Sequence, residues 1–293
     1  MRKYLPDYCT VRTFKWPTAI VIGLIHVAAL AAPFTFSWTG LILCLVLYYM
    51  SGGLGITLCY HRFLTHSSFK TYAPVKWFIT TCAVLAFQGN PTSWVSAHRV
   101  HHKESDHEPD PHSPVVVNFL WGHILWLFWR QPGLATREEE QHYTKDLQRD
   151  AAVRFFDKSF LLINILFAAG LYGAGYLIAG PAFGTSLLVW GFFLRIVLCW
   201  HGTWLVNSAT HLWGYSNYTT DDNSKNNWWV ALLSFGEGWH NNHHADQRSA
   251  AHGHKWWEFD LTYVTIRLLE KLGLAWDVVV PRNMQKMDMR KAA

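Results

Sequence analysis

The sequence predicts an all-α integral membrane protein with four transmembrane helices in two hairpins and a cytosolic helical cap that holds a histidine-rich site for two metals. Three observations support this fold class: four long apolar segments, the near absence of charge within them, and 17 histidines beside 20 acidic residues in a chain of 293. Apolar residues make up 51%, little more than the ~45–50% of soluble proteins. Their distribution is therefore more informative than their number.

Each of the four apolar segments is about as long as the ~20 residues that a helix needs to cross a membrane. They are residues 18–36, 38–60, 159–179 and 183–206. Only the last contains a Lys, Arg, Asp or Glu, which is Arg195. One such segment is common in the core of a soluble protein, whereas four are typical of a membrane protein. The links 32–38 and 180–183 are short, so we expect two hairpins.

The positive charges predict the topology. Apart from Arg195, Lys and Arg are confined to the N-terminus, the stretch 62–158 and the segment after residue 207. Because positive residues stay on the cytoplasmic side, both termini and the long middle segment 62–158 should be cytosolic. The chain then has four parts: 1–60 with the first hairpin, 61–158 as the first part of the cap with two histidine boxes and interfacial helices, 159–206 as the second hairpin, and 207–293 as the second part of the cap with the third box.

Composition excludes several classes of protein. Five scattered cysteines without a CxxC motif exclude a disulfide framework and a thiolate zinc site. A net charge of +5 without a Lys/Arg cluster indicates no face for nucleic acid. Near the end, Val264, Leu268 and Leu272 recur at helical spacing before Gly273, which is a natural helix stop. We expect this last helix to pack the cap against the membrane domain.

Most of the clustered histidines lie in three short motifs. These are HRFLTH at 61–66, HRVHH at 98–102 and HNNHH at 240–244, and NSATH adds Asn207 and His211. Residues at i, i+3 and i+4 share one face of a helix, so HRVHH and HNNHH can each direct three imidazoles at one volume. His61 and His66 are about 140° apart on an α-helix, and they converge only if the helix ends or loosens between them.

This many imidazoles at one depth point to metal binding. A closed zinc site takes about four ligands, so nine histidines imply two metal ions, or one metal and many bystanders. Imidazole suits iron, copper, zinc and nickel. A pair of iron ions with nitrogen ligands beside a membrane is suited to dioxygen activation. Solvated or core histidines are the usual explanation for a single histidine, but they do not explain three clusters.

The three motifs, with hydrophobic hairpins before and between them, closely resemble those of the integral-membrane fatty acyl desaturases of the delta-9 type, which act on stearoyl-CoA or acyl-lipid. The resemblance covers roughly residues 41–281, and GNPTSWVSAHRVHH, SDHEPDPHSP and FGEGWHNNHH are similar to the bacterial, cyanobacterial and plant branch. It implies an oxygen-dependent oxidoreductase that introduces a cis double bond into a saturated acyl chain at a di-iron centre, using dioxygen and two electrons.

The resemblance also implies the metal ligands, and no catalytic residue beyond the metal centre. Carried over onto this sequence, the ligands of two non-haem iron ions are His61, His66, His98, His101, His102, His211, His240, His243 and His244, with Asn207 acting through water. Zinc is expected as a substitute for iron in purified protein.

A kinked hydrophobic tunnel for the acyl chain is a further implication of the resemblance. The positions that match its bend are Gln88, Trp94, Thr203 and Trp204, and those that match its closed end are Tyr49 and Gly53. From the residues alone, Gly53 belongs to a close-packing helix face and Trp204 is a packed aromatic side chain. Both interpretations are compatible with a tunnel.

One departure from the animal acyl-CoA desaturases concerns the substrate headgroup. Those enzymes carry an asparagine after the glutamine matched by Gln88 and an Arg-Asp pair just before the second box, and these residues hold the CoA headgroup. Here the corresponding residues are Gly89, Ser96 and Ala97. The departure favours an acyl chain esterified to membrane lipid and leaves acyl-CoA open.

Residues around the metals and the source of electrons complete the prediction. Metal-bound histidines usually donate their second nitrogen to a carboxylate or carbonyl, and Asp106, Asp110 and Glu237 are candidates, with His112 as a further neighbour. No Rossmann fingerprint, flavin motif or fused cytochrome-like segment is present. A separate electron donor is therefore implied, either a ferredoxin or a small haem protein with its reductase.

Two other functions remain open. A membrane hydroxylase of alkyl chains or sterols uses similar boxes but inserts oxygen, so its product would differ. A membrane metal transporter also combines histidines with apolar helices, but its ligands should lie within the spans. The nine candidate histidines here lie at or beyond the cytosolic ends of the predicted spans.

Overall fold

The computed structural model describes residues 5–282, which fold mostly into helices. The helices are α1 (Trp16–Ala29), η1 (Ala32–Thr35), α2 (Trp38–Tyr48), η2 (Tyr49–Thr65), α3 (Ala73–Leu85), α4 (Pro91–Glu104), α5 (Phe119–His123), η3 (Leu125–Phe128), α6 (Arg137–Tyr143), α7 (Ala151–Ala179), α8 (Pro181–Leu188), η4 (Val189–Leu194), α9 (Arg195–Ser208), η5 (Ala209–His211), α10 (Trp228–Leu233), α11 (His240–Ala245) and α12 (Leu261–Lys271). Strands β1 (Lys70–Thr71) and β2 (Ala275–Trp276) pair antiparallel. The predicted helical class is confirmed.

Three continuous helices are long and apolar enough to cross a membrane. They are Trp38–Thr65, Ala151–Ala179 and Pro181–His211. The first predicted segment behaves differently, because α1 has 14 residues and ends at Ala29 before the 3-10 turn η1. Pro33 lies in that turn, and its nitrogen cannot donate to the carbonyl of Ala29. The length criterion therefore gives three membrane helices in the described residues where the sequence predicts four.

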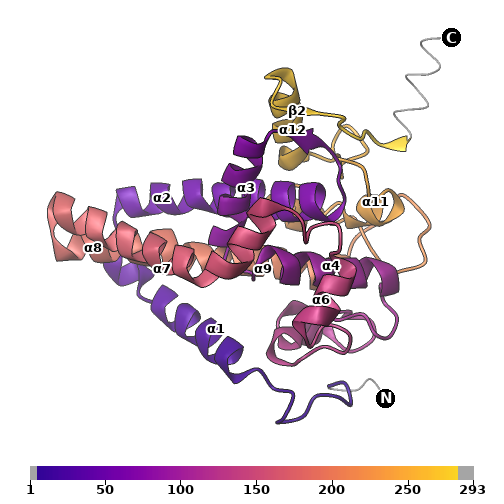
Figure 1. Cartoon of the computed structure of the whole chain (residues 1–293), viewed down its shortest axis with the longest axis horizontal. Coiled ribbons are helices and arrows are strands. Elements are labelled where there is room, and N and C mark those ends of the chain that lie inside the picture. Colours follow the sequence, from indigo (N-terminus) through magenta and orange to yellow (C-terminus); the bar gives the residue numbers. More distant parts are fainter. Residues whose placement is uncertain (1–4, 283–293) are drawn as a thin grey trace.

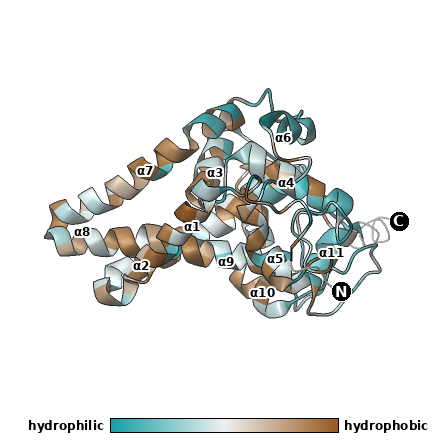
Figure 2. Cartoon of the chain, turned by 90° about the horizontal axis from the view of Figure 1, so that it is seen from below, coloured by the Kyte–Doolittle hydropathy of each residue, from teal (hydrophilic) through white to brown (hydrophobic). Residues whose placement is uncertain are grey.

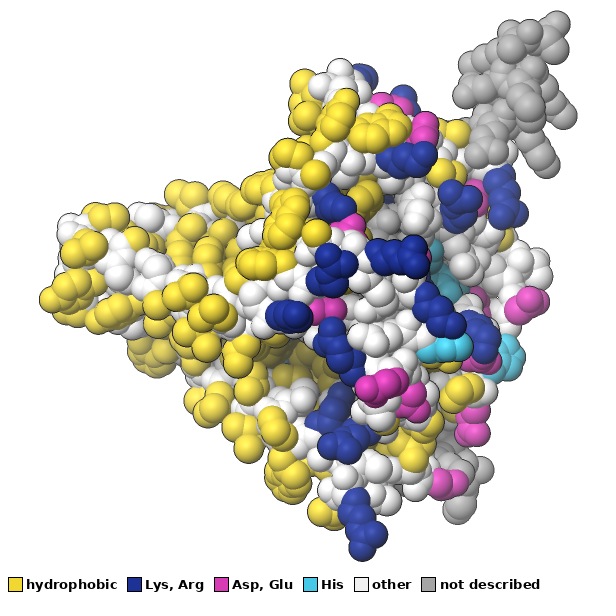
Figure 3. Space-filling view, viewed as in Figure 1, with side chains coloured by type: hydrophobic (Ala, Val, Ile, Leu, Met, Phe, Trp, Pro, Cys, Tyr) yellow, Lys and Arg dark blue, Asp and Glu magenta, His cyan; other side chains and the backbone are white. Residues whose placement is uncertain are grey.

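The molecule has two regions of different polarity. Helices α1, α2, α7 and α8 extend towards one side, and α4, α6 and α11 gather at the other (Figure 1). Apolar residues are abundant in α2, α7 and α9, whereas α6 and α11 are hydrophilic (Figure 2). Hydrophobic side chains cover the extended side, and Lys and Arg side chains gather along its boundary (Figure 3). This distribution is that of a membrane protein with a polar region outside the bilayer.

The second half of the helix Trp38–Thr65 is a π-helix, η2. A π-helix makes i→i+5 hydrogen bonds and is wider than an α-helix. At its end, the amide of His66 donates to the carbonyl of His61 at 3.2 Å. The two imidazole centroids lie 4.9 Å apart. The helix thus both loosens and ends where the spacing of His61 and His66 requires it.

The buried end of α3 is held by polar side chains from the long helices. The guanidinium of Arg195 is fully buried and donates to the carbonyl of Leu85, and the amide of Asn164 donates to the carbonyl of Val84 at 3.1 Å. These bonds satisfy terminal carbonyl groups that have no partner inside α3. The cation also suits the negative end of the helix dipole. Arg195 therefore fixes the C-terminal end of α3, from which the chain continues to Gln88.

Two glycines allow helices to pack in direct backbone contact. A Cβ atom on Gly55 of η2 would lie 2.5 Å from the nitrogen of Ala83 on α3. A Cβ atom on Gly175 of α7 would lie 2.7 Å from the Cα atom of Gly184 on α8. Neither contact leaves room for a side chain. The close approach of η2 to α3 places the histidines at the end of η2 beside the chain that follows α3.

Helix α12 has the predicted period and packs on the membrane helix Trp38–Thr65 through η2, as expected, but its apolar stripe is not the buried face. It ends before Gly273, whose φ is +69°, as expected. However, Val264 and Leu268 are 51% and 55% exposed. The buried face instead carries Thr262, whose hydroxyl donates to the carbonyl of Phe235 at 2.9 Å. The apolar stripe therefore faces outwards, an arrangement suited to the surface of a bilayer.

Candidate metal centre

The nine histidines singled out in the sequence lie together in the polar region and fall into two clusters. Within each cluster, one ring nitrogen of every member lies within 4.8 Å of the others. The first cluster comprises His61, His66, His98, His102 and His243, and the second comprises His101, His211, His240 and His244. Two groups of this size agree with two metal ions rather than one.

Each histidine box on a helix divides between the two clusters. On α4, His98 and His102 join the first cluster and His101 joins the second. On α11, His243 alone joins the first cluster and the other two histidines of the box join the second. Adjacent helical residues differ by about 100°, which is enough to direct them at different centres. The expectation that the three histidines of one box point at a single site is therefore wrong. Helices α4 and α11 each supply histidines to both clusters.

Ring nitrogens in the first cluster face one another in a way that hydrogen bonds cannot satisfy. His243 Nε2 lies 3.0 Å from His61 Nε2 and 2.9 Å from His102 Nε2. His102 Nε2 also lies 3.0 Å from His98 Nε2. Each neutral ring carries one hydrogen, and alternating donors and acceptors along these four rings leave two hydrogens for three contacts, so one contact has no hydrogen of its own. Nitrogens about 2.1 Å from a metal are about 3.0 Å apart when they bind at right angles. The spacing is that of ligands around a cation.

Carboxylates hold the far side of three rings in the second cluster. The Nδ1 atoms lie 3.0 Å from a carboxylate oxygen of Asp110 for His101, 2.9 Å from one of Asp106 for His211, and 2.5 Å from one of Asp222 for His244. With Nδ1–H donated outwards, Nε2 presents its lone pair to the centre. The Nε2 atoms of His101 and His244 are buried without a hydrogen-bond partner in the described structure. This donor set fits a metal ion.

The protonation of these pairs follows from burial and pairing. Burial opposes ionisation of Asp106, but the hydrogen bond and charge of His211 outweigh it and lower the pKa to about 2. Burial lowers the pKa of His244 to about 4, so its ring is neutral at physiological pH. At His101, burial also lowers the pKa, but the nearby Asp110 raises it overall. A proton therefore competes with a metal ion for His101 more strongly than for His244.

Glu237 connects the first cluster to a buried network. Its carboxylate lies 2.5 Å from His61 Nδ1, 3.2 Å from His252 Nδ1 and 3.0 Å from a guanidinium nitrogen of Arg62. Arg62 is fully buried and also pairs with Asp260 at 2.9 Å. Burial opposes ionisation of Glu237, but its interactions with His252, His61 and Arg62 hold its pKa well below the usual range. The network fixes the orientation of the His61 ring.

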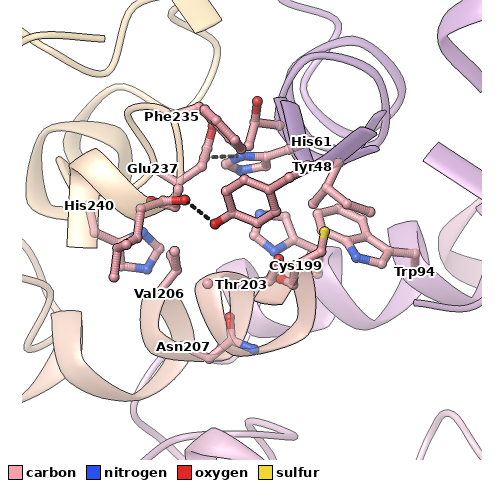
Figure 4. Close-up of a pocket in the computed structure, with 17 residues that line it drawn as sticks. Tyr48, His61, Trp94, Cys199, Thr203, Val206, Asn207, Phe235, Glu237 and His240 are labelled. Carbon is pink, nitrogen blue, oxygen red and sulfur yellow. Dashed lines mark hydrogen bonds and ion pairs between the residues drawn. The ribbon is translucent and has the colours of Figure 1, made fainter. Parts of the chain in front are cut away.

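Two cavities meet beside the clusters. The larger, of about 490 Å³, is lined by residues of α1, α4 and α9 together with aromatic side chains such as Phe87 and Trp126. The smaller encloses about 40 Å³ and reaches from His61 and His240 to Tyr48 (Figure 4). The residues that line both are Trp94, His98, Thr203 and Asn207. Together the cavities make a mainly apolar path that passes the first cluster.

The structure brings the four predicted bend residues together. The amide of Gln88 donates to the hydroxyl of Thr203 at 2.9 Å and accepts from the indole of Trp94 at 3.2 Å. Trp204, like these three, lines the larger cavity.

The two residues predicted at the closed end are placed differently. Tyr49 and Gly53 are not among the residues that line the two cavities. The hydroxyl of Tyr49 bonds to Thr265 at 2.6 Å, while Tyr48 and Gly52 line the smaller cavity. The π-helical turn that begins at Tyr49 gives this segment a different periodicity from the α-helix that the sequence suggested.

Of the four residues predicted around the metals, Asp106, Asp110 and Glu237 contact ring nitrogens of the clusters. His112 contacts a ligand ring instead, with its centroid 4.3 Å from that of His101.

Sequence reasoning missed two residues of this surrounding. Asp222 belongs to the run TTDDNS, where no spacing marks it as a partner of His244. His252 lies outside the three boxes, yet its ring centroid is 4.3 Å from that of His243. Only the tertiary fold brings either residue to the clusters.

Comparisons with known proteins agree with this geometry. The family model described as fatty acid desaturase matches residues 36–277. An sn-1 stearoyl-lipid 9-desaturase of Anabaena variabilis is 47% identical over 266 residues, which cover 90% of this chain and 93% of that protein. An acyl-CoA 5-desaturase of Anemone leveillei is 45% identical, covering 92% and 81%. A chloroplastic palmitoyl-monogalactosyldiacylglycerol delta-7 desaturase of Arabidopsis thaliana is 42% identical, covering 92% and 70%. The chain therefore belongs to the fatty acid desaturase family and is an oxygen-dependent oxidoreductase.

Proposed function

We propose that the protein is a delta-9 fatty acyl desaturase, which introduces a cis double bond into a saturated acyl chain. The observation that supports this best is the mainly apolar path beside two clusters of imidazoles. The overall reaction converts two adjacent methylenes, dioxygen, two electrons and two protons into a double bond and two waters. Methylene hydrogens are not acidic, so an acid–base site could not remove them.

The two clusters hold two iron ions in this proposal, with zinc as a substitute in purified protein. The nine histidines are the ligands, and Asn207 acts through water from its place on the wall of both cavities. Bound iron supplies the oxidising power, drawn from dioxygen, that removal of two hydrogens from a methylene pair requires. The convergent ring nitrogens and the outward carboxylates support this assignment over structural histidines.

The residues of the path position the acyl chain and exclude water. Gln88, Trp94 and Thr203 are joined by hydrogen bonds to one another, so their polar atoms are satisfied and the surface left to the chain is mainly apolar. A bend at this place presents one pair of carbons to the first cluster. Holding the reacting atoms in place in this way is the main contribution that a protein makes to such a reaction.

The substrate in this proposal is an acyl chain esterified to membrane lipid, with acyl-CoA as the alternative. The relatives are named for both kinds of substrate. The larger cavity is lined by one cation, Lys15, and one carboxylate, Glu140. CoA carries several phosphate charges, which this pair does not neutralise. Gly89 and Ala97 line the same cavity and offer no charged contact either.

A separate electron donor, a ferredoxin or a small haem protein with its reductase, delivers the two electrons. His66, His98 and His102 of the first cluster are only partly buried, whereas all four members of the second cluster are buried. The first cluster is thus closer to solvent. A donor would approach the polar region on that side.

The proposed topology has four membrane spans in two hairpins, with the termini and the active site cytosolic. The 14 residues of α1 span about 21 Å, and η1 extends the segment further. Ile20, Leu24 and Val27 on α1 are more than half exposed, as expected beside lipid. The domain division is then 1–60, 61–158, 159–206 and 207–293. Lys and Arg along the boundary in Figure 3 support the cytosolic side for the polar region.

The test is lipid analysis of a host that makes saturated acyl chains and supplies a compatible electron donor. The chain should add a cis double bond at carbon 9. His101→Ala should abolish it and lower bound iron, while His142→Ala, an exposed position on α6, should do neither. A hydroxylated chain would identify a membrane hydroxylase instead. An unchanged lipid profile with an active donor would exclude both enzymes.

A further inference from the structure

Three histidines outside the two clusters form a separate hydrogen-bonded chain. They are His26 on α1, His201 on α9 and His123 on α5. His26 Nε2 lies 3.1 Å from His201 Nε2, and His201 Nδ1 lies 2.9 Å from His123 Nε2. We call these residues the histidine chain. It ties together three elements that are far apart in the sequence.

Both ends of the histidine chain terminate on backbone carbonyl groups. His26 Nδ1 lies 2.8 Å from the carbonyl oxygen of Ile22. At the other end, His123 Nδ1 lies 3.0 Å from the hydroxyl of Ser208, which donates to the carbonyl of Trp204 at 2.7 Å. The histidine chain therefore contains five hydrogen-bond links, and it runs between two carbonyl groups that can only accept hydrogen bonds.

The hydrogens available to these links can be counted. Three neutral imidazoles carry one N–H each and Ser208 carries one O–H, so four hydrogens serve five links. One link is open while all three rings are neutral. Each ring then donates at most one hydrogen bond and accepts at most one. An amide side chain offers both, so glutamine is a conservative replacement for a ring in this chain.

The histidine chain surrounds a residue of the cavity wall. The ring of His26 stacks on Trp204 at a centroid distance of 6.3 Å and an interplanar angle of 18°. His201 and His123 contact the same indole edge-on, at 5.1 and 5.8 Å. Trp204 lines the larger cavity, whereas none of the three histidines lines either cavity. The chain thus lies behind the wall that the indole forms.

Directional bonds matter here because the packing of α1 against α9 is otherwise apolar. Ile22 and Ile25 of α1 pack against Trp200 and Trp204 in an apolar cluster. Apolar contacts of this kind allow small sliding and rotation. Side-chain hydrogen bonds between helices in an apolar environment instead fix one relative orientation. The histidine chain supplies two such bonds between rings that all contact the Trp204 indole.

We propose that His26, His201 and His123 are positioning residues, which hold the Trp204 wall and thereby determine which carbon atoms of the acyl chain lie beside the first cluster. The proposal rests on the desaturation proposed above. The histidines exchange nothing with the substrate and act through Trp204. Their loss should let the acyl chain slide by one or more methylenes while the metal clusters stay intact.

The experiment compares His201→Ala with His201→Gln in membranes that contain stearoyl lipid, iron and an electron donor. Mass spectrometry locates the double bond, and electrons consumed per double bond measure coupling. For His201→Ala, the share of double bonds at neighbouring carbons should rise by up to about tenfold, the ratio that corresponds to one neutral hydrogen bond. Electrons consumed per double bond should also rise. Bound iron should match wild type, and His201→Gln should restore most of the wild-type pattern.

Two further variants keep the test decisive if His201→Ala does not fold. His26→Leu and His123→Ala cut different links of the chain and should shift the products in the same way. His142→Ala, on the exposed face of α6, is the matched control and should leave products and coupling unchanged. Wild-type double-bond position and coupling in iron-loaded variants would overturn the positioning role. A wild-type protein that forms no double bond at all would instead refute the proposed function.

Discussion

The carboxylate partners of the ligand rings allow one metal site to be weakened selectively. Asp106 accepts hydrogen bonds from His211 Nδ1 at 2.9 Å, from the hydroxyl of Ser113 at 2.7 Å and from the amide of Asn223 at 2.7 Å. Asp106→Asn removes the charge but nearly preserves the shape. The φ of Asp106 is +60°, a region that asparagine tolerates well, so the backbone need not change.

The expected loss follows from the contact with His211. A hydrogen bond to a charged group contributes about 1.5–3 kcal/mol, and loss of the outer partner of a metal-bound histidine typically lowers metal affinity by about 10–100-fold. Asp106 contacts a ring of the second cluster and no ring of the first. Asp106→Asn should therefore weaken one of two metal sites by about 10–100-fold and leave the other unchanged.

The assay is metal analysis of protein equilibrated with graded concentrations of chelator. Wild type should lose its two metals at similar chelator concentrations, whereas Asp106→Asn should lose one metal much earlier and keep the second. Asp277→Asn is the matched control, because Asp277 forms an exposed pair with Lys70. Equal curves for Asp106→Asn and wild type, or simultaneous loss of both metals, would refute this account of the second cluster.

Three further predictions concern packing, the cavity and pH. Gly55→Ala should lower the melting temperature, because its Cβ would lie 2.5 Å from the backbone of Ala83. Overpacking of this kind costs about 1–3 kcal/mol. Gly170→Ala on α7, which has open space around it, should leave the melting temperature unchanged. The new side chain in Gly52→Leu would enter the smaller cavity beside Phe235, so the variant should desaturate fewer stearoyl and more palmitoyl chains. An unchanged ratio of the two products would place the closed end of the acyl-chain path elsewhere. Metal-free protein should lose stability as the pH falls from about 6.5 to about 4. Histidines of the unfolded chain bind protons over this window, whereas burial lowers the pKa of folded His244 to about 4, so its ring stays neutral until that pH. Relative to acid pH, His244 alone contributes on the order of 3 kcal/mol to the free energy of unfolding at neutral pH. Denaturation midpoints that do not fall over this window would contradict the assignment.

The chemistry of the candidate site was largely predictable from the sequence because the ligands are local patterns. HRVHH and HNNHH place imidazoles at helical spacing, and all nine predicted histidines meet in the structure. The division of each box between two clusters was not predictable. It depends on how α4 and α11 are oriented towards each other, which no local pattern encodes. Asp222 and His252 reach the clusters through the same tertiary arrangement.

The fold was predictable where hydropathy dominates and less so where backbone geometry does. Three long apolar helices follow directly from composition. The π-helix that begins at Tyr49 changes which residues face the cavity, and hydropathy carries no signal for it. On α12, the leucine pattern suggested burial against the membrane domain. The helix does pack on η2, but through the opposite face, where Thr262 bonds to Thr57 and donates to the carbonyl of Phe235.

The most direct test of the central claim is the stoichiometry of purified protein in lipid membranes with iron, a reductase-coupled electron donor and labelled stearoyl lipid. We predict two irons per chain and one double bond between carbons 9 and 10 for each dioxygen and each pair of electrons consumed. A protein that binds two irons and consumes dioxygen with an active donor, yet leaves the stearoyl chain saturated or adds a hydroxyl group, would contradict the account.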